Sequence, residues 1–162
     1  MAVQTVSYGT PLVFNPSTGN AVFDPTSLAD SAGSLSYRLD LGSTGRASLY
    51  KWIVRTKTSA TMTPGKVLEV RLVTSDGTRA DGNFSSVNQA VTDGNARQNA
   101  GLIGQVIADR ATSGGDALIA SGIVTIVDRY VQVMWWNSLG VSLTGLSTDH
   151  EFVLIPIVAT VA

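Results

Sequence analysis

The stretch YVQVMWWNSLGVSLT, residues 130–144, has a strand pattern from which a hairpin register can be derived. Its first half alternates between two sets of side chains, and alternate side chains lie on opposite faces of a β-strand. The first set is Val131, Val133 and Trp135, and the second is Gln132, Met134 and Trp136. Because the first set is wholly apolar, the pattern predicts a strand with that face against a core.

The strand is followed by the four residues Asn-Ser-Leu-Gly, which end at Gly140. This order suits a type I turn with Gly140 in the left-handed conformation, leading back into a second strand. The hairpin register then places Asn137 opposite Val141 and Trp135 opposite Leu143. Val141 and Leu143 extend the apolar face, so the turn residues and the apolar pattern agree.

Other segments also have apolar side chains at every second residue. Strands are expected over 34–41 (Leu35, Tyr37, Leu39, Leu41 on one face), 49–57 (Tyr50, Trp52, Val54), 66–74 (Leu68, Val70, Leu72), 102–108, 117–127, 130–137, 141–144 and 151–158. A Pro64-Gly65 turn would join 49–57 to 66–74 as a hairpin, with a bulge or odd-length loop to keep the apolar faces together. Residues 75–100 contain three Asp-Gly pairs and are expected to be mostly loop.

These segments give about eight strands with closely spaced turns and no long amphipathic helix. The pattern predicts an all-β fold, a single-domain antiparallel β-sandwich of jelly-roll-like type. Residues 1–33 are broken up by prolines and glycines and are expected to form an irregular N-terminal arm. The sandwich domain would then span residues 34–162.

The amino-acid composition bears on which partners the chain can have. Charged residues make up 14% of the chain and hydrophobic residues 44%, so part of the surface is expected to be covered by other subunits. A neutral surface rich in serine and threonine is the other interpretation. Residues 38–79 carry eight cations against three carboxylates, yet the net charge of −1 gives no general attraction to nucleic acid or to anionic membrane. No signal sequence or membrane-length apolar run is present, so synthesis in the cytosol and a location away from membranes are expected.

Catalytic and metal-binding patterns are not found in the sequence. The chain has no cysteine, and its single histidine, His150, is expected to be exposed beside a turn-capping Asp149. The acidic stretch 76–83 lacks the order of a calcium loop, and turn formation explains it more simply. Only Glu69 and Glu151 are glutamates, and nothing places two carboxylates together. The sequence predicts no catalytic, cofactor-binding or metal-binding residues, no cofactor, and a protein that is not an enzyme.

Contact residues are predicted instead. By parity Trp135 faces the core, whereas Met134 and Trp136 point away from it and would form an exposed apolar patch. The expected arm carries four apolar side chains without a core of its own. The predicted interface residues are Val13, Phe14, Val22, Phe23, Met134 and Trp136. Trp136 with its neighbours is also a possible sugar-stacking platform.

Two segments resemble a known family. The first is Gly65-Lys-Val-Leu-Glu-Val-Arg-Leu-Val-Thr-Ser-Asp-Gly-Thr78, leading into Ala80-Asp-Gly-Asn83. The second comprises Asp128-Arg-Tyr-Val-Gln-Val, Asn137-Ser-Leu-Gly140 and Ser147-Thr-Asp-His-Glu-Phe-Val-Leu-Ile-Pro156. Together they resemble virion structural proteins of tailed bacteriophages of the capsid decoration (cement) type, over roughly residues 34–158.

The resemblance implies a non-enzymatic β-sandwich on the capsid exterior of a virion, made in the host cytoplasm. Its implied partners are copies of itself, as a dimer or trimer, and the major capsid protein, with no nucleic acid and no membrane. The Met134-Trp135-Trp136 run is bulkier than expected for that family, which leaves the contact surface open. A carbohydrate-binding module, or a tail or adhesin component displayed on the virion, is the alternative function.

Overall fold

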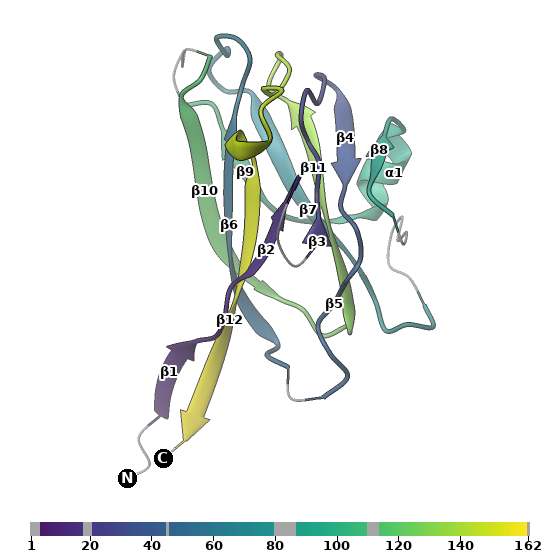
Figure 1. Cartoon of the computed structure of the whole chain (residues 1–162), viewed down its shortest axis with the longest axis vertical. Helices are drawn as coiled ribbons and strands as arrows, with labels where there is room; N and C mark the ends of the chain where they lie inside the picture. Colours follow the sequence, from purple (N-terminus) through teal and green to yellow (C-terminus); the bar gives the residue numbers. More distant parts are fainter. Residues whose placement is uncertain (1–3, 18–20, 45, 80–86, 110–113, 162) are drawn as a thin grey trace.

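The computed structural model describes residues 4–17, 21–44, 46–79, 87–109 and 114–161. Two sheets pack face to face, as the sequence predicted (Figure 1). Sheet A holds β1 (Gln4–Tyr8), β2 (Leu12–Asn15), β3 (Ala21–Val22), β6 (Leu49–Lys57), β10 (Ala117–Thr125) and β12 (Glu151–Val161). Sheet B holds β4 (Ala32–Leu35), β5 (Leu39–Asp40), β7 (Val67–Ser75), β8 (Gln89–Val91), β9 (Gly101–Ile107) and β11 (Tyr130–Ser138). The short helices are α1 (Gly94–Asn99) and the 3-10 turn η1 (Ser147–Asp149).

The strand order is β10-β6-β12-β2-β3 in sheet A, with β1 on β12, and β8-β4-β11-β7-β9 in sheet B, with β5 on β11. Among the described residues, the strand pairings are antiparallel except for the parallel pair of β2 and β3. From β9 to β12 the chain alternates between the two sheets, which is typical of jelly-roll connections. The all-β sandwich prediction is confirmed.

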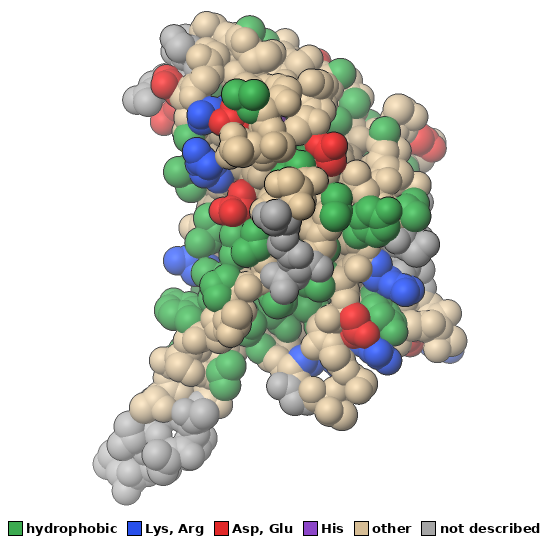
Figure 2. All heavy atoms as spheres, in the orientation of Figure 1, with side chains coloured by type: hydrophobic (Ala, Val, Ile, Leu, Met, Phe, Trp, Pro, Cys, Tyr) green, Lys and Arg blue, Asp and Glu red, His purple; other side chains and the backbone are tan. Residues whose placement is uncertain are grey.

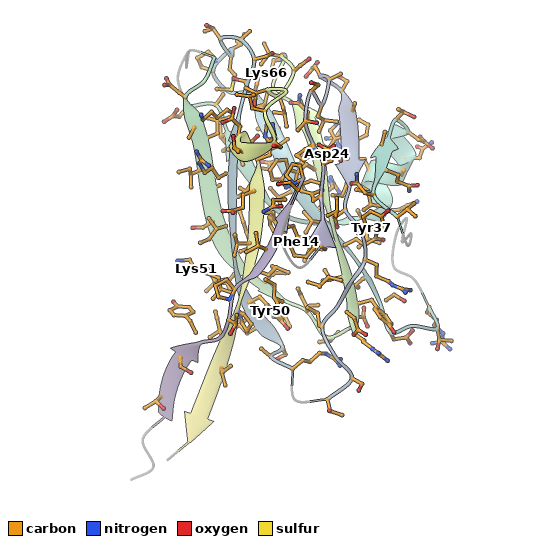
Figure 3. The ribbon with its side chains drawn as sticks, viewed as in Figure 1. Phe14, Asp24, Tyr37, Tyr50, Lys51 and Lys66 are labelled. Atoms are coloured by element: carbon orange, nitrogen blue, oxygen red, sulfur yellow. The ribbon has the colours of Figure 1, made fainter. Side chains whose placement is uncertain are left out.

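The core lies between the sheets. It is filled by the side chains that the alternating pattern of the sequence predicted to face inward. Its centre holds Tyr50, Trp52 and Val54 of β6, Leu68, Val70 and Leu72 of β7, and Val131, Val133 and Trp135 of β11. Phe23 packs edge-on against Trp135, with 4.8 Å between ring centroids. Phe14 likewise packs on Phe152, at 5.7 Å, and Figure 3 shows Phe14 directed between the sheets.

The hairpin predicted after β11 is wrong in its partner. β11 pairs with β7 along one edge and with β4 and β5 along the other, so Trp135 lies opposite Val70 and Ser34. Because both edges of β11 are occupied, the segment after the turn cannot join it, and Leu143 bridges Thr58 instead. The turn itself is as predicted, since Gly140 has a φ of 78°.

Two further predicted features differ from the structure. The strands over 49–57 and 66–74 are not a hairpin, because β6 lies in sheet A and β7 in sheet B, and the Pro64-Gly65 turn belongs to a crossover between the sheets. The strand expected over 34–41 is divided into β4 and β5 by a one-residue shift in register at Ser36, whose hydroxyl accepts a hydrogen bond from the Val133 N–H at 3.0 Å. That shift sends Leu35 to the outer side of sheet B and Leu39 to the core.

The segment predicted as an arm contributes to both sheets. β1, β2 and β3 lie in sheet A, and β4 spans the expected boundary at residue 33. Phe14 and Phe23 are fully buried in the main core, so the sandwich draws part of its core from this segment. Among the described residues, no helix is long and apolar enough to span a membrane.

Candidate functional site

The candidate site is the outer face of sheet A, formed by the alternate side chains that point away from the core. These are Leu49, Lys51, Ile53 and Arg55 of β6, Ile119, Ser121 and Ile123 of β10, Val153, Ile155 and Ile157 of β12, and Val6 and Tyr8 of β1. The strand registers align them in rows: Ile53 lies between Ser121 and Val153, and Ile157 lies between Leu49 and Tyr8. Apolar side chains therefore continue across four neighbouring strands.

Much of this apolar surface is open to solvent. Val6, Tyr8, Ile119 and Ile123 are 64%, 66%, 65% and 65% exposed. Figure 2 shows apolar side chains gathered over the strands of sheet A. Four such side chains present on the order of 500 Å², near the upper end of the largest apolar patch on a typical monomer, and patches of this size often mark contact surfaces.

A two-stranded ribbon extends this face beyond the sandwich. β6 ends its pairing with β12 at Leu49 and Ile157, so the last residues of β12 pair only with β1. The ribbon, defined here as Gln4–Tyr8 with Ile157–Val161, projects from the body and has the chain ends at its tip (Figure 1). It carries no charged residue.

The charges on the outer face of sheet A are few. Lys51 points away from the core, on the opposite side of β6 from the buried Tyr50 (Figure 3). Arg55 lies opposite Glu151 in the register, and its Nη1 donates to the carbonyl of Thr148 at 3.2 Å. Lys51 lies between Ile123 and Ile155 in the register, so its long side chain can lay its stem along apolar surface.

The outer side of sheet B is different, because other elements cover it. Helix α1 and β8 form a second apolar cluster there: Leu35, Val73, Val91, Ala96, Ala100, Met134 and Trp136. Glu69 holds α1 on the sheet, accepting hydrogen bonds from Arg71 Nε at 2.7 Å and Arg97 Nε at 2.8 Å. The Arg97 guanidinium also lies 5.2 Å from the Trp136 ring centroid. Among the described residues, sheet A is covered in this way only at one end of its outer face, where η1 contacts Arg55 and Lys57.

The predicted interface residues do not come together. Met134 and Trp136 are 0% and 5% exposed, so the expected exposed patch is wrong: they do point away from the main core, but α1 packs over them. Phe14 and Phe23 are also buried in the core. Val22 is 40% exposed on β3. Val13 is half-buried on β2, opposite Val153, at the margin of the outer face of sheet A.

The prediction that His150 is exposed is also wrong. His150 is 1% exposed; its Nδ1 lies 2.8 Å from Thr56 Oγ1 and its Nε2 lies 2.9 Å from the Thr144 carbonyl. Burial lowers the pKa of His150 below its usual 6.5. The neighbouring Asp149 pairs with Lys57 at 2.8 Å, and the hydrogen bond from Lys57 lowers the pKa of Asp149. These contacts join the start of β12 to β6 and hold the sandwich together at this end.

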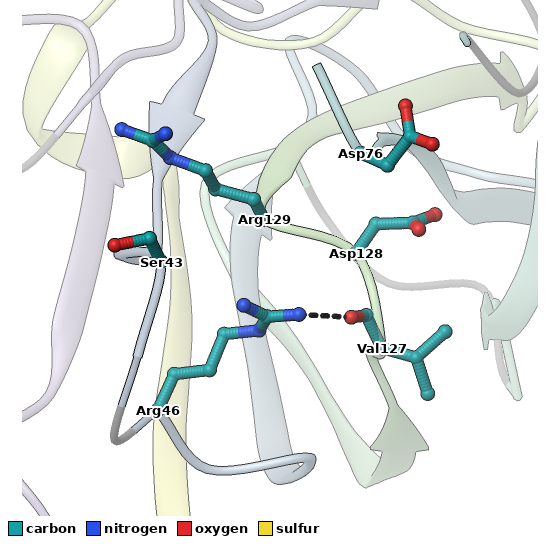
Figure 4. Close-up of a pocket in the computed structure, with 6 residues that line it drawn as sticks. All are labelled: Ser43, Arg46, Asp76, Val127, Asp128 and Arg129. Carbon is teal, nitrogen blue, oxygen red and sulfur yellow. Dashed lines mark hydrogen bonds between the residues drawn. The ribbon is translucent and has the colours of Figure 1, made fainter. Parts of the chain in front are cut away.

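An open polar pocket lies at the base of the sandwich, and Figure 4 shows the residues that line it. Its volume is about 270 Å³. Its charged groups already have partners within the chain. Arg46 donates to the carbonyls of Gly42 and Val127, and Arg129 Nη2 pairs with Asp40 Oδ2 at 2.7 Å. The hydrogen bond from Arg129 holds the pKa of Asp40 at about 2. These contacts tie the loop after β5 to the start of β11, which is a structural role.

The acidic stretch 76–83 is described only as far as Arg79. There Asp76 Oδ1 accepts from the backbone N–H groups of Thr78 at 2.6 Å and Arg79 at 2.7 Å, in keeping with a turn. Among the described residues, no group of three or more histidine, aspartate or glutamate side chains is placed to hold a metal ion.

The outer face of sheet A was missed at the sequence level, although a signal was present. The segment ALIASGIVT, residues 117–125, was expected to be a strand, and it carries apolar side chains at both parities. Leu118 and Val124 face the core, while Ile119 and Ile123 face outward. A strand that is apolar on both faces indicates a second surface to cover.

Comparison with known proteins assigns no family. No protein-family model matches the chain, and no curated protein matches it. Among solved structures it is similar to the EclA C-terminal domain, a sugar-binding protein, at 15% identity over 86% of this chain and 76% of that chain, with a TM-score of 0.29. It is also similar to the enzymatically active domain of tailspike protein 4 of bacteriophage CBA120, at 10% identity over 98% of this chain and 19% of that chain, with a TM-score of 0.24. Since both TM-scores are below 0.5, these likenesses leave the function of this chain open.

Proposed function

We propose that this chain is a non-enzymatic structural protein that decorates and stabilises the outside of a bacteriophage capsid. The observation that carries the proposal is the outer face of sheet A, an apolar sheet surface continued by the ribbon. A surface of this kind suits a contact with another protein, where apolar area is removed from water.

A small ligand fits the molecule less well. Sites for small molecules are concave and mostly apolar, with a few polar groups free to orient the ligand. The pocket in Figure 4 is open and polar, and Arg46 and Arg129 are already bonded within the chain. A second pocket of about 290 Å³, between Asp24 and Gln89, is also open.

The capsid as partner is supported by the sequence resemblance. The two segments that carry it include β7 and both ends of β11, and these strands pair along nine residues in the middle of sheet B. The charged fraction of 14% is in keeping with a subunit whose surface is shared with neighbours. Under this proposal the chain assembles with copies of itself and with the major capsid protein.

The alternative of a carbohydrate-binding or tail component remains distinct. Its expected platform was Trp136, but Trp52, Trp135 and Trp136 are all at most 5% exposed. Exposed aromatic surface is found at Tyr8 and Tyr37, which are 66% and 43% exposed. A glycan array tests this alternative, because binding that Tyr37→Ala abolishes would support it over decoration.

The direct test is the number of copies in a virion. Virions of the phage that encodes this chain are purified and their proteins quantified on gels against the major capsid protein. Decoration predicts hundreds of copies per particle, accessible to antibody on intact heads. Absence from the virion, or a handful of copies located on the tail, would contradict the proposal.

A further inference from the structure

We propose that a second copy of this chain covers the outer face of sheet A, with the ribbon of each copy packed against the sheet of the other. This inference deepens the proposed function, since a decoration protein assembles as several copies, and it rests on that function only for its biological setting. The surface is defined by Val6, Tyr8, Ile119 and Ile123, with the half-buried apolar side chains between them.

The apolar area of the face is close to what a stable dimer needs. The four most exposed side chains supply on the order of 500 Å², and a standard protein interface needs about 800 Å² from each partner. Leu49, which is 37% exposed, and the half-buried Ile53, Ile155 and Ile157 lie between those four and supply further area. The apolar face thus approaches the required size without any rearrangement of the fold.

The ribbon needs a partner of its own. Isolated two-stranded ribbons are marginal in water unless one face packs on something. In the register, Val6 faces Ala159 and Tyr8 faces Ile157, so one side of the ribbon is apolar and continues the outer face of sheet A. The ribbon projects away from its own sandwich (Figure 1), and within the described part of the chain Val6 and Tyr8 stay 64% and 66% exposed, so a second molecule can cover this apolar side.

A second copy offers a surface that fits. Sheets pack face to face at about 10 Å, with a modest angle set by their twist, so an apolar sheet face is best covered by another sheet. In a closed dimer, each ribbon lies on the sheet of the other copy, so both apolar faces are covered at once. No such face is then left open to bind further copies into a filament. Within the described chain, the outer side of sheet B cannot serve, because α1 already covers much of it.

The charges allow this pairing. The cations on the face are Lys51, Arg55 and Lys57. Glu151 lies opposite Arg55 in the register, and Lys57 is paired with Asp149 at 2.8 Å. The ribbon carries no charged residue, so its docking brings no like charge against Lys51 or Arg55. A ribbon that ended in lysines would be repelled from this face.

Because the chain has no cysteine, engineered cysteines can report the contact. A tagged Tyr8→Cys chain is mixed with an untagged Ile123→Cys chain under mild oxidation, and disulfide-linked dimers that contain both are measured. The expected result is efficient cross-linking that dilution to nanomolar concentration abolishes. The control mixture pairs Tyr8→Cys with Ile107→Cys, because Ile107 is 56% exposed on β9 of sheet B and should not cross-link. Equal yields in both mixtures, or none in either, would overturn the inference.

The cross-linking experiment and the virion analysis distinguish a failure of the dimer from a failure of the proposed function. Circular dichroism establishes first that each cysteine variant keeps the β-sheet signal and melting temperature of the parent. If no specific cross-link forms, self-association through this face is wrong, even if virions contain hundreds of copies. If the cross-link forms but virions lack the chain, the dimer stands and capsid decoration is wrong.

Discussion

Gly122 of β10 lies directly against the indole of Trp52, so that a methyl group on its Cα would sit 2.7 Å from the ring carbon Cζ2. Gly104 of β9 crowds the same ring, since a Cβ there would also overlap Cζ2. The two glycines belong to different sheets, and Trp52 fills the space between them at the open edge of the sandwich. This edge lies beside the face on which assembly is proposed.

Gly122→Ala is therefore expected to destabilise the fold by about 1–3 kcal/mol, the usual cost of overpacking a core. The indole of Trp52 lies between β10 and β9, so it cannot move away from Gly122 without displacing β9 of sheet B. Denaturant unfolding followed by tryptophan fluorescence measures the loss. Gly94→Ala is the matched control, because nothing lies within 4 Å of a Cβ at Gly94, and its free energy of unfolding should be unchanged or slightly raised. Equal stability of the two variants would refute the contact with Trp52.

Gly140→Val should cost about 1–3 kcal/mol, because a β-branched residue is strained at positive φ. Gly140 has a φ of 78°, and its N–H donates to Asp30 Oδ1 at 2.8 Å. Gly140→Asn should lose less, since asparagine tolerates the left-handed conformation. Thermal melts of the two variants give the comparison, and a valine variant as stable as the asparagine variant would contradict the turn geometry.

Acid should weaken the fold through His150. The folded-state pKa of His150 is lowered by burial, so its protonation favours the unfolded chain, whose histidine keeps a pKa near 6.5. The stabilisation is complete above pH 6.5 and is lost as the pH falls through the folded-state pKa. The free energy of unfolding of the parent should therefore begin to decrease as the pH falls below about 6.5.

His150→Gln supplies the control for this prediction. Glutamine can still donate to the Thr144 carbonyl but does not titrate, so the variant should lose about 1–2 kcal/mol at pH 7 and show a flatter dependence on pH. Because His150 is the only histidine, the difference between the two curves belongs to it. Parallel curves would show that the buried position of His150 is incorrect.

Glu69→Ala should release helix α1 from sheet B. Burial tends to raise the pKa of Glu69, but hydrogen bonds from Arg97 and Arg71 outweigh it and leave the pKa lowered, so the carboxylate is ionised at neutral pH. Removing the buried partner of two arginines is expected to cost about 3 kcal/mol. Hydrogen exchange should speed up in α1 more than in β6. Uniform exchange across both elements would contradict the role of Glu69 as the local attachment of α1.

The sequence predicted the core of the sandwich well, because one physical rule sufficed. Alternation placed Tyr50, Trp52 and Val54 on the inner side of β6 and Trp135 on the inner side of β11, where the structure has them. Alternation does not say which strand lies beside which. The pairing of β1 with β12 joins residues about 150 positions apart, and no local pattern encodes it.

The surfaces were harder to predict, for a reason that Met134 and Trp136 illustrate. Parity correctly turned them away from the main core, but it cannot show that another element covers them. Helix α1 has only Ala96 buried. Its sequence therefore lacks the 3.6-residue apolar period from which an amphipathic helix is predicted. Ile119 and Ile123 did carry a signal, the apolar pattern on both faces of β10.

Sedimentation equilibrium of the intact chain measures whether the outer face of sheet A is buried between copies. At micromolar concentration we expect a mass at least twice the 16.9 kDa of one chain. The double variant Ile119→Asp with Ile123→Asp should fall to the monomer mass, because charge on this face prevents its burial, while Ile107→Asp should keep the mass of the parent. A parent chain that stays at 16.9 kDa over the whole concentration range, or a double variant that assembles like the parent, would contradict the claim.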